Sequence, residues 1–294
     1  MKGKKTTPNH LILIRPLNFG FNEQTSESNK FQDKSSLLFS EPEEAIDEFK
    51  AVVRTLIEHD ISFTIFNETE TDIIKPDAIF SNNWVVYTPN GPAYTMTMLT
   101  ENRKAEVNHS LIIGQYDTKF ENNDLPLEGT GSMVIDHENK KIYANLSSRT
   151  NYIVLSDFAS KINYNLITFN SSDSNNDEIY HTNVIMSIGE KWAVICKDVI
   201  VDYKDVVSSL ESDDKEIIYI TEDEMKEFCA NIFEVKDING NLNILMSTTA
   251  YNSFNYNDKL NILNKYAKII CAPIHTIETI GGGSLRCMLT GVFL

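Results

Sequence analysis

Short apolar segments that pair across tight polar turns recur along this chain, and helical segments lie between them. Residues 132–136 and 141–145 flank one polar turn, and residues 183–188 and 191–196 flank a glycine-glutamate turn. Apolar residues at helical spacing follow the first pair at residues 152–162. Because strands joined by tight turns pair antiparallel, a doubly wound parallel sheet fits less well. We therefore expect an α/β fold, with residues 1–294 forming one domain of similar modules of about fifty residues each.

The remaining elements follow from the same periodicities. Capping boxes at Ser40/Glu43 and Thr221/Glu224 predict the starts of two helices. The segments expected as strands are 11–15, 62–66, 78–88, 166–169, 242–246 and 268–272, and those expected as helices are 40–60, 221–233 and 258–267.

Charge and cysteine content exclude several classes of partner. Lys and Arg total 26 against 42 Asp and Glu, a formal net charge of −16, so neither nucleic acid nor an anionic membrane is an expected partner. We expect no membrane span and no signal peptide. The four scattered cysteines favour a reducing cytoplasm over a zinc cluster or disulfides. No metal or organic cofactor is implied; the expected partner is a small-molecule substrate, and an acidic surface with exposed aromatics permits a homodimer.

The carboxyl-terminal segment carries the first chemical signal. Gly281-Gly282-Gly283 marks close backbone approach, and Arg286-Cys287 follows within four residues. A cysteine beside a cation on such a turn can become a thiolate nucleophile. The alternative is a buried, inert cysteine.

Three further polar groups stand at the predicted strand ends. They are Asn82-Asn83 within an apolar run, Glu128 before two glycines, and His181 before an apolar run. Taken singly, each fits a turn, an exposed acid or a structural histidine. Together with a cysteine they supply the parts for covalent catalysis with an oriented acid–base partner.

These groups, in this order, resemble the guanidino-group-modifying superfamily, which includes arginine deiminases, glycine amidinotransferases and dimethylarginine dimethylaminohydrolases. The resemblance extends from Arg15-Pro16 to the terminal glycine run and is nearest to the citrulline-utilisation hydrolase branch. The motifs that carry it are Phe19-Gly20-Phe21-Asn22, Asn82-Asn83-Trp84, Leu127-Glu128-Gly129-Thr130-Gly131-Ser132 and Leu146-Ser147-Ser148-Arg149-Thr150. It implies the pentein fold, five ββαβ modules around a pseudo-fivefold axis with the site at the centre.

The resemblance also implies roles for individual residues. Cys287 would attack the central carbon of a guanidino or ureido group. His181 would protonate the leaving amine and later activate water, while Glu128 would orient His181 and hold substrate N–H groups.

Three arginines are candidates for further roles in this site. Arg149 matches the family arginine that binds the substrate α-carboxylate, a task that suits a planar fork of donors. Arg103 is a second candidate for that task, or else a helix-surface arginine paired with a nearby acid. Arg286 would contact substrate or help to keep Cys287 ionised.

Two departures from the deiminase pattern bear on the substrate. Asn83 and Asn183 stand where deiminases usually have aspartates, and Asn82 adjoins the first of them. Amides suit a neutral ureido group, which needs both donors and acceptors. Asp77 is not expected to substitute for Asn83, because six residues of extended strand span roughly 20 Å.

The sequence therefore favours a cysteine hydrolase that acts on citrulline or a close analogue, with a Cys–His ion pair and a bell-shaped pH profile. A deiminase or amidinotransferase acting on a guanidino substrate is the second hypothesis. An inactive relative that serves as a binding module is the third.

Overall fold

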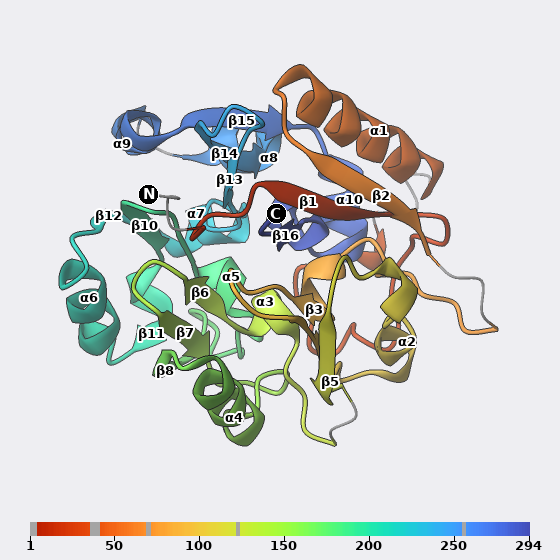
Figure 1. Ribbon diagram of the computed structural model, residues 1–294, viewed down its shortest axis with the longest axis horizontal. Coiled ribbons are helices and arrows are strands. Elements are labelled where there is room, and N and C mark those ends of the chain that lie inside the picture. The colour runs from red at the N-terminus through yellow and green to blue at the C-terminus, as the bar shows by residue number, and fades with distance from the viewer. Residues whose placement is uncertain (1–4, 36–41, 69–71, 122–123, 255–256) are drawn as a thin grey trace.

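The strands and helices expected from the sequence alternate along the chain. The computed structural model describes residues 5–35, 42–68, 72–121, 124–254 and 257–294 (Figure 1). Its mixture of strands and helices confirms the α/β class. The capping box expected at Ser40 lies outside the described residues, whereas the one at Thr221 is present, with both reciprocal hydrogen bonds.

Five sheets within the described residues share one strand order. In each, an inner strand pairs antiparallel with a middle strand, which pairs parallel with an outer strand. The sheets are β16 (Thr290–Val292), β1 (His10–Arg15) and β2 (Phe63–Asn67); β3 (Val85–Val86), β4 (Ala93–Met96) and β5 (Tyr116–Phe120); β6 (Val134–Asp136), β7 (Lys141–Asn145) and β8 (Asn165–Ser171), extended by β11 (Ile200–Val201); β9 (Met186–Ile188), β10 (Trp192–Ile195) and β12 (Glu216–Tyr219); and β13 (Phe233–Lys236), β14 (Leu242–Ser247) and β15 (Lys268–Ala272).

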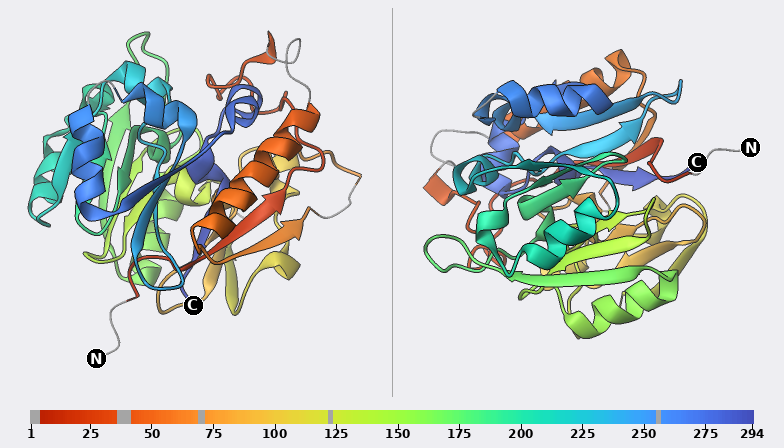
Figure 2. Two further views of the ribbon diagram at one scale, coloured as in Figure 1. Left: turned by 90° about the horizontal axis from the view of Figure 1, so that it is seen from above. Right: turned by 90° about the vertical axis from the view of Figure 1, so that its left-hand side faces the viewer.

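The longer helices connect middle strands to outer strands and cover the outside of the sheets (Figures 1 and 2). They are α1 (Pro42–Glu58), α4 (Tyr152–Ile162), α6 (Lys204–Glu211) and α9 (Asn257–Tyr266). Helix α1 shows why they lie there, because Phe49, Val52 and Leu56 recur at helical spacing and are buried against the sheet core. The shorter helices are α2 (Glu101–Lys104), α7 (Glu222–Lys226), α8 (Thr248–Ser253) and α10 (His275–Gly281), with 3₁₀ turns η3 (His109–Leu111) and η4 (Lys197–Val199).

A short turn directly precedes each inner strand, and four of the five turns are helical. The named turns are η2 (Ser81–Asn83), α3 (Gly129–Ser132), α5 (Thr182–Ile185) and η5 (Leu285–Met288), and residues 228–231 form the fifth, non-helical turn before β13. Turn α3 contacts both α5 and η2, and η2 contacts η5. The polar groups of the sequence therefore stand at the starts of inner strands, on turns that pack together.

These turns correct three predicted elements. Residues 78–88 are not one strand, because a turn and η2 leave only β3 extended. Residues 183–185 belong to α5, so the second hairpin begins only at Met186. The helix that opens at Thr221 ends at Lys226 instead of continuing to residue 233. In each case a buried polar side chain next to the inner strand needs partners that a continuous strand or helix would not supply.

The two ends of the described chain meet in one sheet. Strands β1 and β16 pair antiparallel, with Leu11 opposite Gly291 (Figure 2). Side-chain and backbone bonds between Asn9 and Leu294 extend this pairing. In the part of the chain that is described, no helix combines the length and the apolar character that crossing a bilayer requires.

Candidate active site

Cys287 lies on η5, buried where the turn meets the residues before β13. Its Sγ accepts hydrogen bonds from Nδ2 of Asn231 at 3.4 Å and from Nδ2 of Asn183 at 3.6 Å. Burial raises the pKa of the Cys287 thiol, and the amide donors, led by Asn231, oppose that rise. In the unliganded structure, therefore, the sulfur is held as a thiol beside donors that would favour its ionised form.

The glycine run before Cys287 allows the backbone to pack closely against Phe80. A side chain at Gly281 or Gly283 would collide with the ring of Phe80, and Gly282 has a φ of 67°. Only residues without a Cβ let Phe80 pack this closely and let the chain turn here. The close approach expected from the sequence is therefore present.

His181 and Glu128 form a buried pair. Nε2 of His181 lies 2.8 Å from Oε2 of Glu128, and Oε1 of Glu128 accepts the backbone N–H of Leu99 at 3.0 Å. Burial lowers the pKa of His181 to about 4 in spite of its carboxylate partner. Burial alone would raise the pKa of Glu128, but Arg149 and His181 hold it well below its ordinary range. The pair is thus a neutral imidazole held by an ionised carboxylate, with Nδ1 left for other partners.

A cavity of about 20 Å³ brings the thiol and the imidazole together. Its walls include residues on or beside four of the five turns, all except α3. They are formed by Asn29, Asp77, Phe80, Asn83, Arg103, Arg149, Tyr180, His181, Val184, Phe228, Gly281, Gly282, Gly283 and Cys287. Within the described chain no hydrogen bond joins His181 to Cys287. The Cys–His ion pair expected from the sequence is therefore not formed here.

Arg149 borders this cavity and is almost completely buried. Its guanidinium lies 3.4 Å from Glu128, donates to Ser28 at 2.6 Å and stacks 4.2 Å above the ring of Tyr180. Its Nε has no hydrogen-bond partner in the described structure. An unpartnered buried donor at a cavity wall is costly, so it marks a place where a ligand oxygen would bind.

Asp77 also borders the cavity, which contradicts the expectation drawn from an extended strand. Residues 77–80 form a turn instead, so the carboxylate lies 3.9 Å from Arg103 and accepts from Nδ2 of Asn22 at 2.7 Å. Its Oδ1 is buried without a partner. Burial raises the pKa of Asp77, and Arg103 opposes that effect. The site therefore contains an acidic group that the sequence interpretation had set aside.

Arg103 is a buried, fully paired arginine and not a surface residue. It binds Glu106 through Nε at 2.9 Å and Nη2 at 3.0 Å. With its amide oxygen turned toward Arg103, Asn83 accepts from both terminal nitrogens at 3.2 and 3.3 Å. The N–H donors of Arg103 are thus bound to protein groups. Arg149 is therefore the better candidate to bind an anionic group of a ligand.

Three predicted substrate-binding residues, Asn82, Asn183 and Arg286, do not border the cavity, although Asn183 contacts the Cys287 sulfur. Asn82 is fully buried and its Nδ2 donates to Thr130 at 3.3 Å. Arg286 donates to the Leu289 carbonyl at 2.8 Å and stacks on Phe233, in a different cavity. Consecutive residues of η5 point in different directions, so Cys287 and Arg286 cannot both face the substrate.

The sequence interpretation missed Asn231, which contacts the sulfur directly. The sequence feature that could have indicated Asn231 is its position, because it is a polar residue just before β13 in the segment Cys229-Ala230-Asn231. The other four inner strands are each preceded by a predicted site residue, so this fifth turn completes the pattern. Tyr180, which stacks on Arg149, had no separate signal beyond its place beside His181. Among the described residues, no group of three or more His, Cys, Asp or Glu side chains could hold a metal ion.

Comparison with solved structures shows the fold that this geometry belongs to. Apo ArgZ, an arginine dihydrolase from the ornithine-ammonia cycle in cyanobacteria, aligns over 96% of this chain with 14% identity and a TM-score of 0.72, although the chain spans only 40% of ArgZ. The substrate-bound N-terminal domain of an ArgZ variant aligns over 97% of this chain and 99% of that domain, with 14% identity and a TM-score of 0.71. A variant of dimethylarginine dimethylaminohydrolase carrying an S-methyl-L-thiocitrulline adduct aligns over 97% of this chain and 99% of its own, with 16% identity and a TM-score of 0.65.

Comparison at the level of sequence places the chain in a family. No curated protein matches it. The sequence profile of the family described as N,N dimethylarginine dimethylhydrolase, eukaryotic, matches residues 15–294, nearly the whole chain. The superfamily expected from the motifs is thereby confirmed: this chain belongs to the N,N dimethylarginine dimethylhydrolase family of guanidino-modifying pentein proteins.

Proposed function

We propose that this protein hydrolyses a C–N bond in the guanidino group of a small amino acid, through a covalent intermediate on Cys287. The observation that carries this proposal is that Cys287, His181 and Asp77 all line the same cavity. A nucleophile, an acid–base group and an acceptor for a cation are the parts that this reaction needs.

The unpartnered atoms of the cavity favour an amino acid with a cationic side chain. Oδ1 of Asp77 is an acceptor without a donor, and Nε of Arg149 is a donor without an acceptor. A ligand with a cationic group and a carboxylate satisfies both.

A cationic substrate would also oppose the effect of burial, which raises the pKa of the Cys287 thiol. A guanidinium beside Cys287 favours the thiolate, and His181 takes the thiol proton at Nδ1. The sulfur attacks the guanidino carbon, the C–N bond breaks, and the same proton leaves with the departing ammonia. Water then attacks the amidino carbon, the C–S bond breaks, and the ureido product forms with one proton released to solvent. Glu128 keeps His181 oriented and stabilises its charged form in between.

Citrulline remains a second candidate substrate. Asn183 and Asn83 are amides at positions where carboxylates would bind a cationic substrate more strongly. Of these two amides, Asn83 borders the cavity, and Nδ2 of Asn183 lies beside the sulfur, so a neutral ureido group would meet at least one amide. An inactive binding protein is the third candidate, and the joint presence of Cys287, His181 and Glu128 in a buried site argues against it.

Product analysis separates these candidates. Arginine, methylated arginine and citrulline are each incubated with the protein and with Cys287→Ala, and ammonia or methylamine and the amino-acid product are quantified. We expect release of amine from a guanidino substrate by the unsubstituted protein alone. Consumption of citrulline without arginine would favour the second candidate, and no consumption by a folded protein would favour the third.

Asp77→Asn provides the matched test of charge, because it keeps the shape of the side chain. We expect kcat/KM for the guanidino substrate to fall about 10- to 100-fold, as for a lost charge-assisted hydrogen bond of about 1.5–3 kcal/mol, with little change for citrulline. Chloroacetamidine should label Cys287 faster than chloroacetamide does, and Asp77→Asn should remove that preference. Equal labelling of the unsubstituted protein by both reagents would contradict a cation site.

The finer architectural expectations belong to the same proposal. We propose that the five sheets are the five modules of a pseudo-fivefold pentein, that residues 1–294 act as one domain, and that the protein works in a reducing cytoplasm. The shared strand order of the sheets and the free state of all four cysteines support these points.

A further inference from the structure

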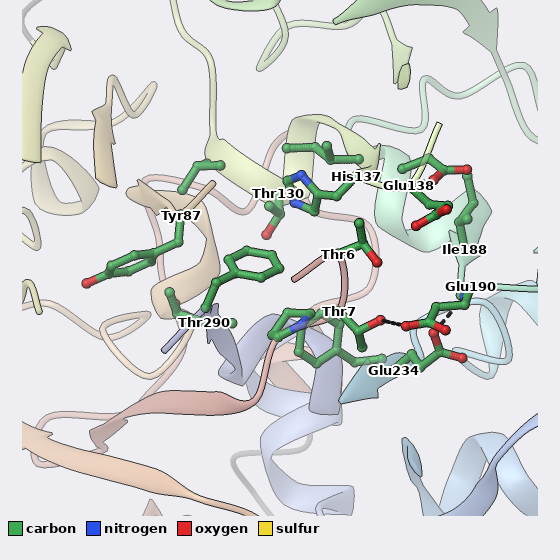
Figure 3. A pocket seen from close by; sticks show the side chains of 18 of the residues that line it. Thr6, Thr7, Tyr87, Thr130, His137, Glu138, Ile188, Glu190, Glu234 and Thr290 are labelled. Atoms are coloured by element: carbon green, nitrogen blue, oxygen red, sulfur yellow. Dashed lines mark hydrogen bonds between the residues drawn. The ribbon is translucent and has the colours of Figure 1, made fainter. Parts of the chain in front are cut away.

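A second cavity, of about 90 Å³, lies at the other end of the inner strands (Figure 3). The residues of the active site stand before these strands, whereas β3, β6, β9, β13 and β16 themselves line this cavity. Figure 3 shows the side chains of Thr7, Glu190 and Glu234 gathered on one side of it, with His137 and Glu138 across from them. Its rim is thus rich in hydroxyl and carboxylate oxygens.

A smaller cavity of about 50 Å³ leads inward from the larger one. The two cavities share four wall residues, Ile135, Ile188, Phe233 and Arg286. At its inner end the smaller cavity is bordered by Asn183, whose Nδ2 contacts the Cys287 sulfur. The two cavities therefore lie in series behind Asn183, and this one side chain separates the inner cavity from the thiol.

Unpartnered polar atoms show what kind of molecule fits the inner cavity. Oδ1 of Asn183 and Oγ of Ser187 are both buried without a hydrogen-bond partner, and both residues border this space. A buried hydroxyl and a buried carbonyl oxygen require small hydrogen-bonding molecules between them. A volume of this size holds more than one such molecule, since one water needs about 10–15 Å³.

We propose that the two cavities form a rear passage that lets water and ammonia move between solvent and the Cys287 side of the active site. This inference rests on the proposed function. Each C–N cleavage releases one ammonia and consumes one water while the amino-acid part of the substrate still occupies the front cavity. Because that part of the substrate fills the front cavity, molecules of one heavy atom need a second route.

The charges along the passage fit neutral ammonia inside and ammonium outside. Arg286 borders both cavities and has no carboxylate within ion-pairing distance in the described structure, so its positive charge opposes cations in the inner part. Glu138 and Glu190 border the outer cavity, and their negative charge favours ammonium there once ammonia has taken a proton from water.

Filling the inner cavity tests this passage. Ser187→Leu places a bulky apolar group there, and Ser187→Ala is the matched control that removes the hydroxyl without filling the space. We expect Ser187→Leu to lower kcat at least tenfold with KM and chloroacetamide labelling of Cys287 unchanged, and Ser187→Ala to stay near the unsubstituted protein. If water entering limits turnover, mass spectrometry will detect a covalent adduct on Cys287; slowed turnover without an adduct assigns the limit to departing ammonia. Equal kcat values for the two variants would overturn the proposal.

Two further measurements keep the proposal open to refutation. If Ser187→Leu loses chloroacetamide labelling, Ile188→Phe with Ile188→Val as control repeats the test farther from the thiol. A high-resolution crystal structure of the unsubstituted protein should show solvent bridging Ser187 and Asn183, and a dry inner cavity would refute the passage. That measurement needs no turnover, so an inactive protein with solvent in this cavity would refute the proposed function and leave the passage standing.

Discussion

Asn231→Ala is expected to raise the pKa of the Cys287 thiol by about one unit. Asn231 is fully buried, and its Nδ2 lies 3.4 Å from the sulfur while also donating to the Asn183 carbonyl at 3.1 Å. A hydrogen bond to a charged acceptor contributes about 1.5–3 kcal/mol, and a shared, long contact to sulfur belongs at the low end. At about 1.4 kcal/mol per pKa unit, its loss leaves roughly tenfold less thiolate at any pH below the thiol pKa.

The assay is the rate of alkylation by iodoacetamide between about pH 6 and pH 10, which reports the thiolate fraction without requiring turnover. We expect the pH–rate profile of Asn231→Ala to shift to higher pH, with the same slope below the pKa. Asn29→Ala is the control, because Asn29 borders the same cavity and hydrogen-bonds the Gly281 carbonyl, not the sulfur. A profile that superimposes on that of the unsubstituted protein, with unfolding temperature preserved, would refute the role assigned to this amide.

Three further outcomes follow from other contacts. Glu128→Gln should lower kcat by about 100-fold or more, since it removes the charge that stabilises the imidazolium; a matching loss of chloroacetamide labelling would indicate a misfolded site instead. Burial lowers the pKa of His137 to about 4, so the unfolded chain binds its proton first and stability falls as pH drops from about 6.5 to 4. His137→Gln should reduce that loss by about 1.4 kcal/mol per pH unit in urea unfolding. Lys215→Met should cost about 3–5 kcal/mol of unfolding free energy, because it strands the buried Asp136 carboxylate 2.9 Å away, and Lys215→Met with Asp136→Asn should recover part of it.

The elements with uninterrupted periodicity could be predicted from the sequence. Helix α4 spans Tyr152–Ile162 as expected, and the first hairpin pairs Val134 with Tyr143. The predictions failed where polar residues interrupt an apolar run, as at residues 78–88. There the side chains of Asn82 and Asn83 take partners distant in sequence, Thr130 and Arg103. Secondary-structure propensity depends on the local sequence, so it gives no information about partners that are distant in the chain.

The proximity of the three proposed catalytic residues could be predicted from the sequence, whereas the presence of Asp77 beside them could not. Motifs indicated Cys287, His181 and Glu128, which the structure places around one cavity or in direct contact. Asp77 and Asn83 were expected to lie far apart because the segment that joins them was assumed to form an extended strand. A turn brings Asp77 to the cavity, and this acidic group is the reason that we propose a cationic substrate instead of a neutral one.

The bond between Asn9 and Leu294 has a consequence for protein engineering. Because β1 and β16 are already neighbours, a short glycine-rich peptide could join these two ends without displacing either strand. New ends could then be opened in an exposed connection such as residues 202–204, before α6, far along the chain from the thiol. A circularly permuted chain of this kind would carry its nucleophile in the interior of the sequence, where affinity tags and fusion partners at either end would stay clear of it.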